Sequence, residues 1–237
     1  MKPIAVLQHV DSDGPAYFAD YLTAHGLPWQ LFAAHRGDAL PAYIGEFAGF
    51  AILGGPMSAN DALPHLDRAA AMVREAVAAG VPVIGHCLGG QIMARALGGS
   101  VTASPAAEIG WSEIAARSAA AARRWFGGRP SFPQFQWHHE SFSLPPGADW
   151  LASSASCPHQ AFAVGDRHLA LQFHCEVDSD KIESWLGADG QAEIEACTAS
   201  PGVQSAAAIR MQSRDRLAAA RAVTDAIYDA WCRGLAN

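Results

Sequence analysis

The sequence has no apolar run long enough for a membrane-spanning helix, which needs about 20 residues. The short apolar stretch near the N-terminus, residues 4–10, reaches polar residues too soon for a signal peptide. These two absences argue against a membrane protein and a secreted one. We therefore expect a soluble, cytoplasmic protein with no membrane contact.

Positive charge is also scarce. The chain carries 16 basic residues against 23 acidic ones, which gives a net charge of -7. It contains no basic block and no stripe of Lys and Arg interleaved with aromatic residues. Proteins that bind nucleic acid or anionic membranes present such patches. The sequence thus predicts no nucleic-acid partner and leaves a small molecule as the expected ligand.

Signatures of disulfide scaffolds, metal sites and nucleotide sites are missing as well. The five cysteines are odd in number and show no CxxC spacing, which is typical of reduced thiols. Neighbouring strand residues such as His138 and His139 point to opposite faces, and no third ligand follows at a suitable spacing. Neither GxxxxGK[ST] nor GxGxxG occurs. We expect no metal and no cofactor.

What the chain does contain is an alternation of apolar runs and amphipathic patterns, in a composition that is 50% hydrophobic and 16% charged. Periodicity predicts strands near residues 4–10, 29–34, 47–55 and 81–87, and helices over 14–26 and 63–80. Continuous apolar strands separated by helices indicate a parallel sheet covered on both faces. The sequence therefore predicts an α/β fold, a mostly parallel sheet flanked by helices.

The second half has a different pattern. Short strand-like runs separated by turn signals occupy residues 110–174 and predict a small antiparallel addition. From about Gly187 the pattern is helical again, with a long amphipathic helix over 203–233. Because there is no internal repeat and no long linker, we expect residues 1–237 to form a single domain with a C-terminal helical extension from about 187.

The stretch GHCLGGQ places Cys87 between a predicted strand and a predicted helix. A sharp strand-to-helix turn forces the side chain at the turn outward, in the geometry called a nucleophile elbow. Gly85, Gly89 and Gly90 permit such a turn, because a Cβ at these positions would crowd it. The helix N-terminus would favour the thiolate. The alternative interpretation is a buried structural cysteine, since free cysteine is among the most often buried residues.

A partner for this thiol is offered by QFHCE, at the end of a later apolar run. His174 and Glu176 lie two residues apart, so on an extended chain they share a face while Cys175 points away. A glutamate that accepts a proton from a histidine fixes the tautomer and aims the other ring nitrogen at a nucleophile. Cys87, His174 and Glu176 are therefore a candidate nucleophile, base and orienter.

GHCLGGQ and QFHCE together resemble the class I glutamine amidotransferase family, whose patterns are G-x-C-x-G-x-Q and a late F-H-P-E. FAILGGPMS is similar to the oxyanion-loop strand end of that family, and WHHESFSLPPGA to a segment of its GMP-synthase-like branch. The resemblance implies a flavodoxin-like sheet. It also implies hydrolysis of a γ-carboxamide, glutamine being the family's substrate, through a γ-glutamyl thioester on Cys87.

The resemblance also implies roles for further residues. The backbone N–H groups of Gly55 and Leu88 would form the oxyanion hole, the two donors that a developing negative charge requires. Gln91 matches a substrate-contacting glutamine. Gly110 and Trp111 fall near the loop that, in the family, holds the amino-acid end of glutamine. Apart from the resemblance, His138 is a candidate to line the mouth of the site, and a surface or packing role is the alternative.

Cys175 departs from the family pattern, because it stands where proline is usual. A disulfide with Cys87 is not expected, since strand alternation turns Cys175 away. The loop at Asp11 and Asp13 follows the first strand and could border the site, although Asp-Ser-Asp-Gly is equally an ordinary turn.

Three functions stay open at this point. In larger relatives a synthetase domain consumes the ammonia; because this chain ends soon after Glu176, at Asn237, we expect a separate synthetase subunit. The first alternative is a stand-alone γ-glutamyl hydrolase or peptidase with the same triad and a larger leaving group. The second is a non-catalytic regulatory or binding subunit, against which the intact triad argues.

Overall fold

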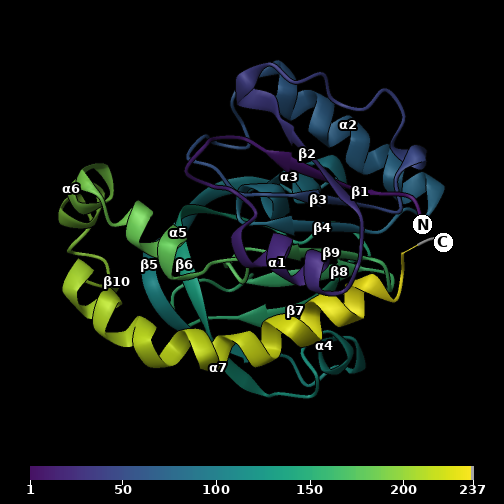
Figure 1. Cartoon of the computed structure of the whole chain (residues 1–237). Helices are drawn as coiled ribbons and strands as arrows, with labels where there is room; N and C mark the ends of the chain where they lie inside the picture. Colours follow the sequence, from purple (N-terminus) through teal and green to yellow (C-terminus); the bar gives the residue numbers. More distant parts are fainter. Residues whose placement is uncertain (236–237) are drawn as a thin grey trace.

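A computed structural model describes residues 1–235 of the chain. Its strands form one ten-stranded sheet, in the order β10-β5-β7-β8-β9-β4-β3-β1-β2, with β6 paired to β5 (Figure 1). Five neighbouring strands are parallel: β1 (Ile4–Gln8), β2 (Trp29–Ala33), β3 (Gly49–Ile52), β4 (Val83–His86) and β9 (His168–Leu171). Nearly all their residues other than those of β2 are buried, as continuous apolar strands require. The predicted α/β class, a mostly parallel sheet flanked by helices, is confirmed.

The antiparallel addition is larger than the sequence suggested. It consists of β5 (Val101–Ala116), β6 (Ser131–Phe142), β7 (Asp149–Ser153) and β8 (Ala161–Val164). β5 and β6 have 16 and 12 residues and are the longest strands. The start of β5 was missed, because Pro105 interrupts the apolar pattern where the register with β6 shifts between Ala103 and Glu108. The two-residue strand β10 (Gly202–Val203) lies parallel to β5.

Helices cover both faces of the sheet. α2 (Pro64–Ala79) and α3 (Leu88–Ala96) lie on one face, and α1 (Ala16–Ala24), α4 (Ala120–Trp125) and the C-terminal part of α7 (Ala206–Cys232) on the other. Two 3₁₀ turns, Ala34–Arg36 and Ile44–Glu46, follow β2 and precede β3. In α2 the buried side chains are those that the helical period predicts: Leu66, Ala69, Met72, Val73 and Ala76. Gly80 ends this helix in the left-handed conformation, with φ 68°.

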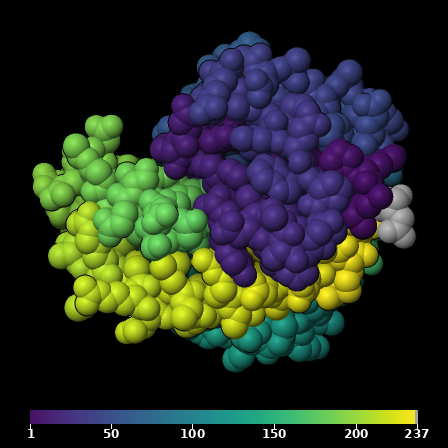
Figure 2. Space-filling view, in the orientation of Figure 1, coloured from purple at the N-terminus to yellow at the C-terminus, as the bar shows by residue number. Residues whose placement is uncertain are grey.

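The helical C-terminal part begins earlier than residue 187. α5 (Ser179–Trp185) starts three residues after Glu176, and α6 (Ala188–Ala196) follows it. The side chain of Asp178 accepts a hydrogen bond from the backbone N–H of Lys181 (2.8 Å) and so caps α5. Figure 2 shows α5 and α6, in green, next to the N-terminal part of the chain, in purple. α7 then returns along the sheet, and its residues Ile227, Tyr228 and Trp231 join the main core.

Neighbouring parallel strands bring their carboxyl ends to one edge of the sheet. β1, β3, β4 and β9 therefore end together at Gln8, Ile52, His86 and Leu171. In open α/β sheets this edge is where ligands bind. Among residues 1–235, no helix combines the length and the apolar character that crossing a membrane would require.

Candidate active site

Cys87 occupies the turn between β4 and α3. It has φ 49° and ψ -107° and is one of two non-glycine residues with positive φ in the described chain. An L-residue with a side chain rarely adopts such a conformation, which costs about 1–3 kcal/mol and is found where function demands it. The backbone N–H of Cys87 donates to the carbonyl of Leu171 (2.8 Å), which fixes the turn against the end of β9.

The glycines around Cys87 allow this turn because their surroundings leave no room for a Cβ. A Cβ on Gly85 would lie 2.5 Å from the carbonyl carbon of Gly89, and one on Gly90 would lie 2.6 Å from the carbonyl oxygen of Leu171. A Cβ on Gly89 would lie 2.8 Å from the carbonyl carbon of Ile52. The α3 N-terminus is therefore pressed onto the sheet, with Cys87 at its tip.

Substitution of Gly89 by alanine should for this reason destabilise the fold. The added Cβ would meet backbone of β3, which cannot rotate away, and overpacking of this kind costs roughly 3 kcal/mol. Urea unfolding measures the change. Gly14→Ala is the matched control, since its Cβ would lie 3.6 Å from the Gln8 side chain, an ordinary contact. Equal stabilities of the two variants would show that the α3 N-terminus is not packed this tightly.

His174 and Glu176 lie just beyond β9. The ring Nδ1 of His174 and Oε1 of Glu176 are 2.6 Å apart, and both side chains are buried. The backbone N–H of His174 donates to the carbonyl of Phe135 (2.8 Å), which ties this segment to β6. Cys87 and His174 line the same cavity. The structure thus brings together the three residues that the sequence singled out.

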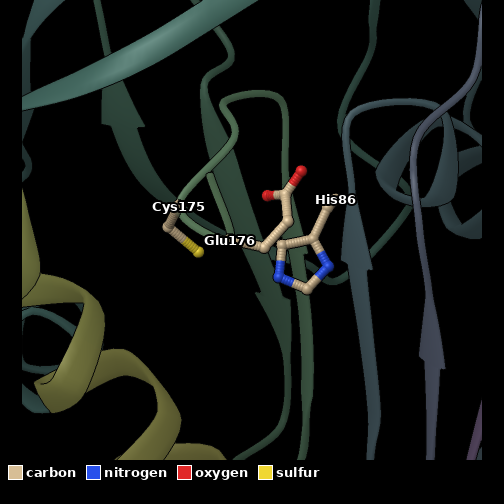
Figure 3. Close-up of side chains that lie close together, drawn as sticks. All are labelled: His86, Cys175 and Glu176. Carbon is tan, nitrogen blue, oxygen red and sulfur yellow. The ribbon is translucent and has the colours of Figure 1, made fainter. Parts of the chain in front are cut away.

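Cys175 points away from the cavity, as strand alternation requires. Its thiol lies 3.5 Å from the hydroxyl of Tyr228 in α7. Figure 3 shows the side chains of Cys175, Glu176 and His86 close together. Burial raises the pKa of the Cys175 thiol, so it stays protonated. Cysteine in place of proline leaves the His174–Glu176 contact formed.

The charges of the pair are set by their neighbours. Burial lowers the pKa of His174, but the Glu176 carboxylate and the Cys87 thiol outweigh this effect and raise the pKa to about 10. Burial raises the pKa of Glu176, but the charges of Lys181 and His174 outweigh it and hold the pKa well below its usual range. An imidazolium at neutral pH can pair with a thiolate and later donate a proton to a leaving group.

Lys181 and Asp13 extend this chain of charges. The Nζ of Lys181 lies 2.9 Å from Oε1 of Glu176 and 2.8 Å from the carbonyl oxygen of Gly14, and it forms an ion pair with Asp13. All these side chains are buried. Burial lowers the pKa of Lys181, but Asp13 and Glu176 outweigh it and raise the pKa. The lysine therefore remains charged inside the protein.

The cavity over Cys87 has a volume of about 690 Å³. Its walls come from the loop after β1, the segment after β3, β6 and the helices α5 and α6. Trp185 of α5 packs edge-on against the ring of His174, with centroids 4.8 Å apart. The thiol of Cys87 lies 3.7 Å from the carbonyl oxygen of Trp137 and 3.6 Å from the amide nitrogen of Gln172.

The remaining predicted site residues divide into two groups. Gly55 and Gln91 line the cavity with Cys87, and Leu88 follows Cys87 as the first residue of α3, where backbone N–H groups have no partner within the helix. The Gln91 amide donates to the carbonyl of Glu140 (3.0 Å). Gly110 and Trp111 do not line the cavity.

Trp111 is instead a core residue. It packs in a cluster between β5, β6 and α7, and its indole N–H donates to Ser213 (2.9 Å). His138 borders the cavity, but its side chain is only 1% exposed and faces the buried Glu108, with Nε2 and Oε2 3.2 Å apart. Gly110 and Trp111 therefore lie away from the cavity over Cys87, and their role as substrate contacts stays a prediction. The His138 ring has a buried partner in Glu108.

Sequence reasoning missed Lys181, Trp185 and Gln172. Lys181 had a signal, because it is one of only two lysines in the chain and follows Glu176 by five residues. Trp185 had none, since α5 was not predicted. Gln172 lies within QFHCE itself. A polar side chain at the end of a buried strand needs a hydrogen-bond partner, and this requirement was the signal for Gln172.

Two groups of side chains in the described chain have the composition of metal ligands. In the first, Asp13, His174 and Glu176, the ammonium group of Lys181 already lies between the carboxylates. In the second, His86, Cys175 and Glu176, the Tyr228 hydroxyl lies 3.3 Å from Nε2 of His86 and 3.5 Å from the thiol. We assign a metal to neither group.

Three comparisons agree with this geometry. Residues 21–187 match the family model described as glutamine amidotransferase class-I. A glutamine amidotransferase-like protein of Salmonella typhimurium is 32% identical over 159 residues, which cover 64% of this chain and 66% of that protein. A glutamine-hydrolyzing GMP synthase of Bordetella avium is 34% identical over 151 residues, 60% of this chain and 28% of the synthase.

Among solved structures, a glutamine amido transferase from Methylobacillus flagellatus superposes with a TM-score of 0.96 at 40% identity, covering 100% of this chain and 96% of that one. The two curated relatives are longer than their match. The aligned part of this chain spans about two thirds of the Salmonella protein and less than a third of the Bordetella synthase.

Proposed function

This chain belongs to the class I glutamine amidotransferase family, and we propose that it hydrolyses the side-chain amide of glutamine through a thioester on Cys87. The observation that carries the proposal is the meeting, in one cavity, of a strained cysteine at a helix N-terminus with a histidine whose partner is a buried carboxylate. A strained turn of this kind costs stability and is typical of a nucleophile.

In the proposed reaction the Cys87 thiolate attacks the amide carbon of glutamine. Negative charge develops on the carbonyl oxygen, and the backbone N–H groups of Leu88 and Gly55 would donate hydrogen bonds to it. His174 gives its proton to the departing nitrogen, and ammonia leaves as the thioester forms. His174 then takes a proton from water, hydroxide attacks the thioester, and glutamate and the free thiol result. Glu176 keeps the imidazole oriented throughout.

The name of the Bordetella relative joins glutamine hydrolysis to a synthetase reaction. We propose by analogy that the ammonia released here passes to a separate synthetase subunit. The cytoplasmic location predicted from the sequence stays a prediction.

One observation favours a second candidate, hydrolysis of a larger γ-glutamyl amide or peptide bond. The cavity of about 690 Å³ falls in the middle of the range of sites that take drug-sized ligands, which leaves room beyond a single glutamine. The two candidates share every step except the leaving group. Values of kcat/KM for glutamine and for γ-glutamyl dipeptides separate them, because the better-fitting leaving group gives the larger value.

An electrophilic glutamine analogue tests the proposal directly. We expect it to add one equivalent of label to Cys87, mapped by mass spectrometry of peptides. Cys87→Ser should take no label. Cys157, Cys197 and Cys232 serve as internal controls, because none of them lines the cavity. Labelling only at those positions, or nowhere, would remove the hydrolase proposal and leave the non-catalytic binding subunit.

A further inference from the structure

Lys181 is a buried cation in the third helical position of α5. The side chain is 4% exposed, and its ammonium group contacts Glu176, Asp13 and the carbonyl oxygen of Gly14. Removing an ammonium from water is costly unless paired charges and hydrogen bonds replace the water. Here the ammonium donates hydrogen bonds to Glu176 and to the carbonyl of Gly14 and forms an ion pair with Asp13. The position is therefore built for a cation.

We propose that Lys181, held by Asp13, is a positioning residue that keeps Glu176 ionised and oriented toward His174. The inference rests on the proposed function, in which Glu176 orients the base. A single oxygen, Oε1 of Glu176, faces both Nδ1 of His174 (2.6 Å) and Nζ of Lys181 (2.9 Å). The other oxygen, Oε2, has no hydrogen-bond partner in the described part of the chain.

Burial alone would make Glu176 a neutral acid, because a carboxylate without counter-charge in a low-dielectric interior takes up a proton. A protonated Glu176 could not accept the Nδ1 proton of His174 as a carboxylate does. Lys181 removes this difficulty, since its charge favours the ionised form. The titratable or charged side chains that surround Glu176 are His174 and Cys175 on its own segment, Lys181 from α5, Asp13 from the loop after β1, His86 from β4, and Tyr228 and Arg221 from α7.

Asp13 completes the arrangement. With His174 protonated, two cations and two anions alternate along Asp13, Lys181, Glu176 and His174, so the buried group is neutral. The same contacts tie α5 to the loop after β1, where the indole N–H of Trp185 also donates to the carbonyl of Ser12 (2.7 Å). The cation that holds Glu176 therefore also anchors the helix that covers His174.

The test is the pH dependence of Cys87 alkylation by iodoacetamide, followed by peptide mass spectrometry in the wild type, Lys181→Met and Lys181→Arg. The acid limb is the low-pH range in which the alkylation rate of Cys87 rises with pH. In Lys181→Met we expect this limb to move to higher pH by about one unit or more, so that alkylation at a given pH on the limb is about tenfold slower. Lys181→Arg keeps the charge and should stay near the wild type. Lys181 does not line the cavity over Cys87; kcat for glutamine should therefore fall in Lys181→Met while KM stays within about twofold.

A purely structural role for Lys181 would lower the stability of Lys181→Met and leave its acid limb in place, which would overturn the inference. If Lys181→Met does not fold, Asp13→Asn combined with Lys181→Met removes the charge imbalance, and the limb should still move. A double variant with the wild-type limb would also overturn it. Because alkylation needs no substrate, this arm remains decisive even if the wild type fails to hydrolyse glutamine, an outcome that would instead reject the proposed function.

Discussion

Replacement of Cys87 by alanine or by glycine is expected to abolish hydrolysis in both variants. The glycine variant is expected to be the more stable of the two. Loss of the nucleophile removes the thioester route altogether, so ammonia release at saturating glutamine should fall by on the order of 10⁴-fold or more. The cavity remains, since only one side chain is shortened. Binding of glutamine should therefore survive in both variants.

The two variants separate the chemistry of the thiol from the strain of the turn. Alanine keeps the Cβ that φ 49° crowds, whereas glycine relieves it. Relief of roughly 2 kcal/mol, less the greater chain entropy that glycine loses on folding, leaves the glycine variant more stable by about 1 kcal/mol. Urea unfolding measures the difference. An alanine variant as stable as the glycine variant would show that the turn is unstrained.

The parts of the fold that follow from local pattern could be predicted from the sequence. β1, β3 and β4 are continuous apolar runs, and α2 shows its buried face in its spacing. The turn at Cys87 was also accessible, because glycines at Gly85, Gly89 and Gly90 have few other reasons to cluster between a strand and a helix. These features depend on neighbours in the sequence.

Features that depend on distant contacts could not be predicted in the same way. The resemblance put Trp111 near the loop that holds the amino-acid end of glutamine, and that role stays a prediction. In the structure α7 covers the Trp111 side chain, and its burial comes from residues about a hundred positions away. α5 is only seven residues long and is held by its Asp178 cap and by contacts with the loop after β1. No periodicity signals so short a helix. Lys181, Trp185 and the wall of the cavity were missed with it.

Glu176→Gln is expected to lower kcat by on the order of 10³–10⁴-fold. The substitution keeps the size of the side chain but removes the charge that raises the pKa of His174, and an amide can offer Nδ1 either an acceptor or a competing donor. His174 would then lose both its orientation and its positive charge. Steady-state ammonia release gives kcat. KM should change little, because Glu176 is fully buried and does not line the cavity.

Glu183→Gln is the matched control. Glu183 lies on the exposed side of α5 and pairs with Arg210 (2.9 Å). Glu183→Gln therefore removes one carboxylate near the site and leaves Cys87, His174 and Glu176 unchanged. Activity should stay within about twofold of the wild type. A Glu176→Gln enzyme that retained a tenth of wild-type kcat would contradict the role given to Glu176.

The comparison of Glu176→Gln with Lys181→Met distinguishes the orienter from the group that keeps it charged. In Lys181→Met the carboxylate is still present, and raising the pH above its elevated pKa should ionise it and restore much of kcat. In Glu176→Gln there is nothing to ionise, so no pH restores the rate. Recovery with pH in one variant and none in the other is the pattern expected if the charge of Glu176 orients His174 and Lys181 acts through that charge.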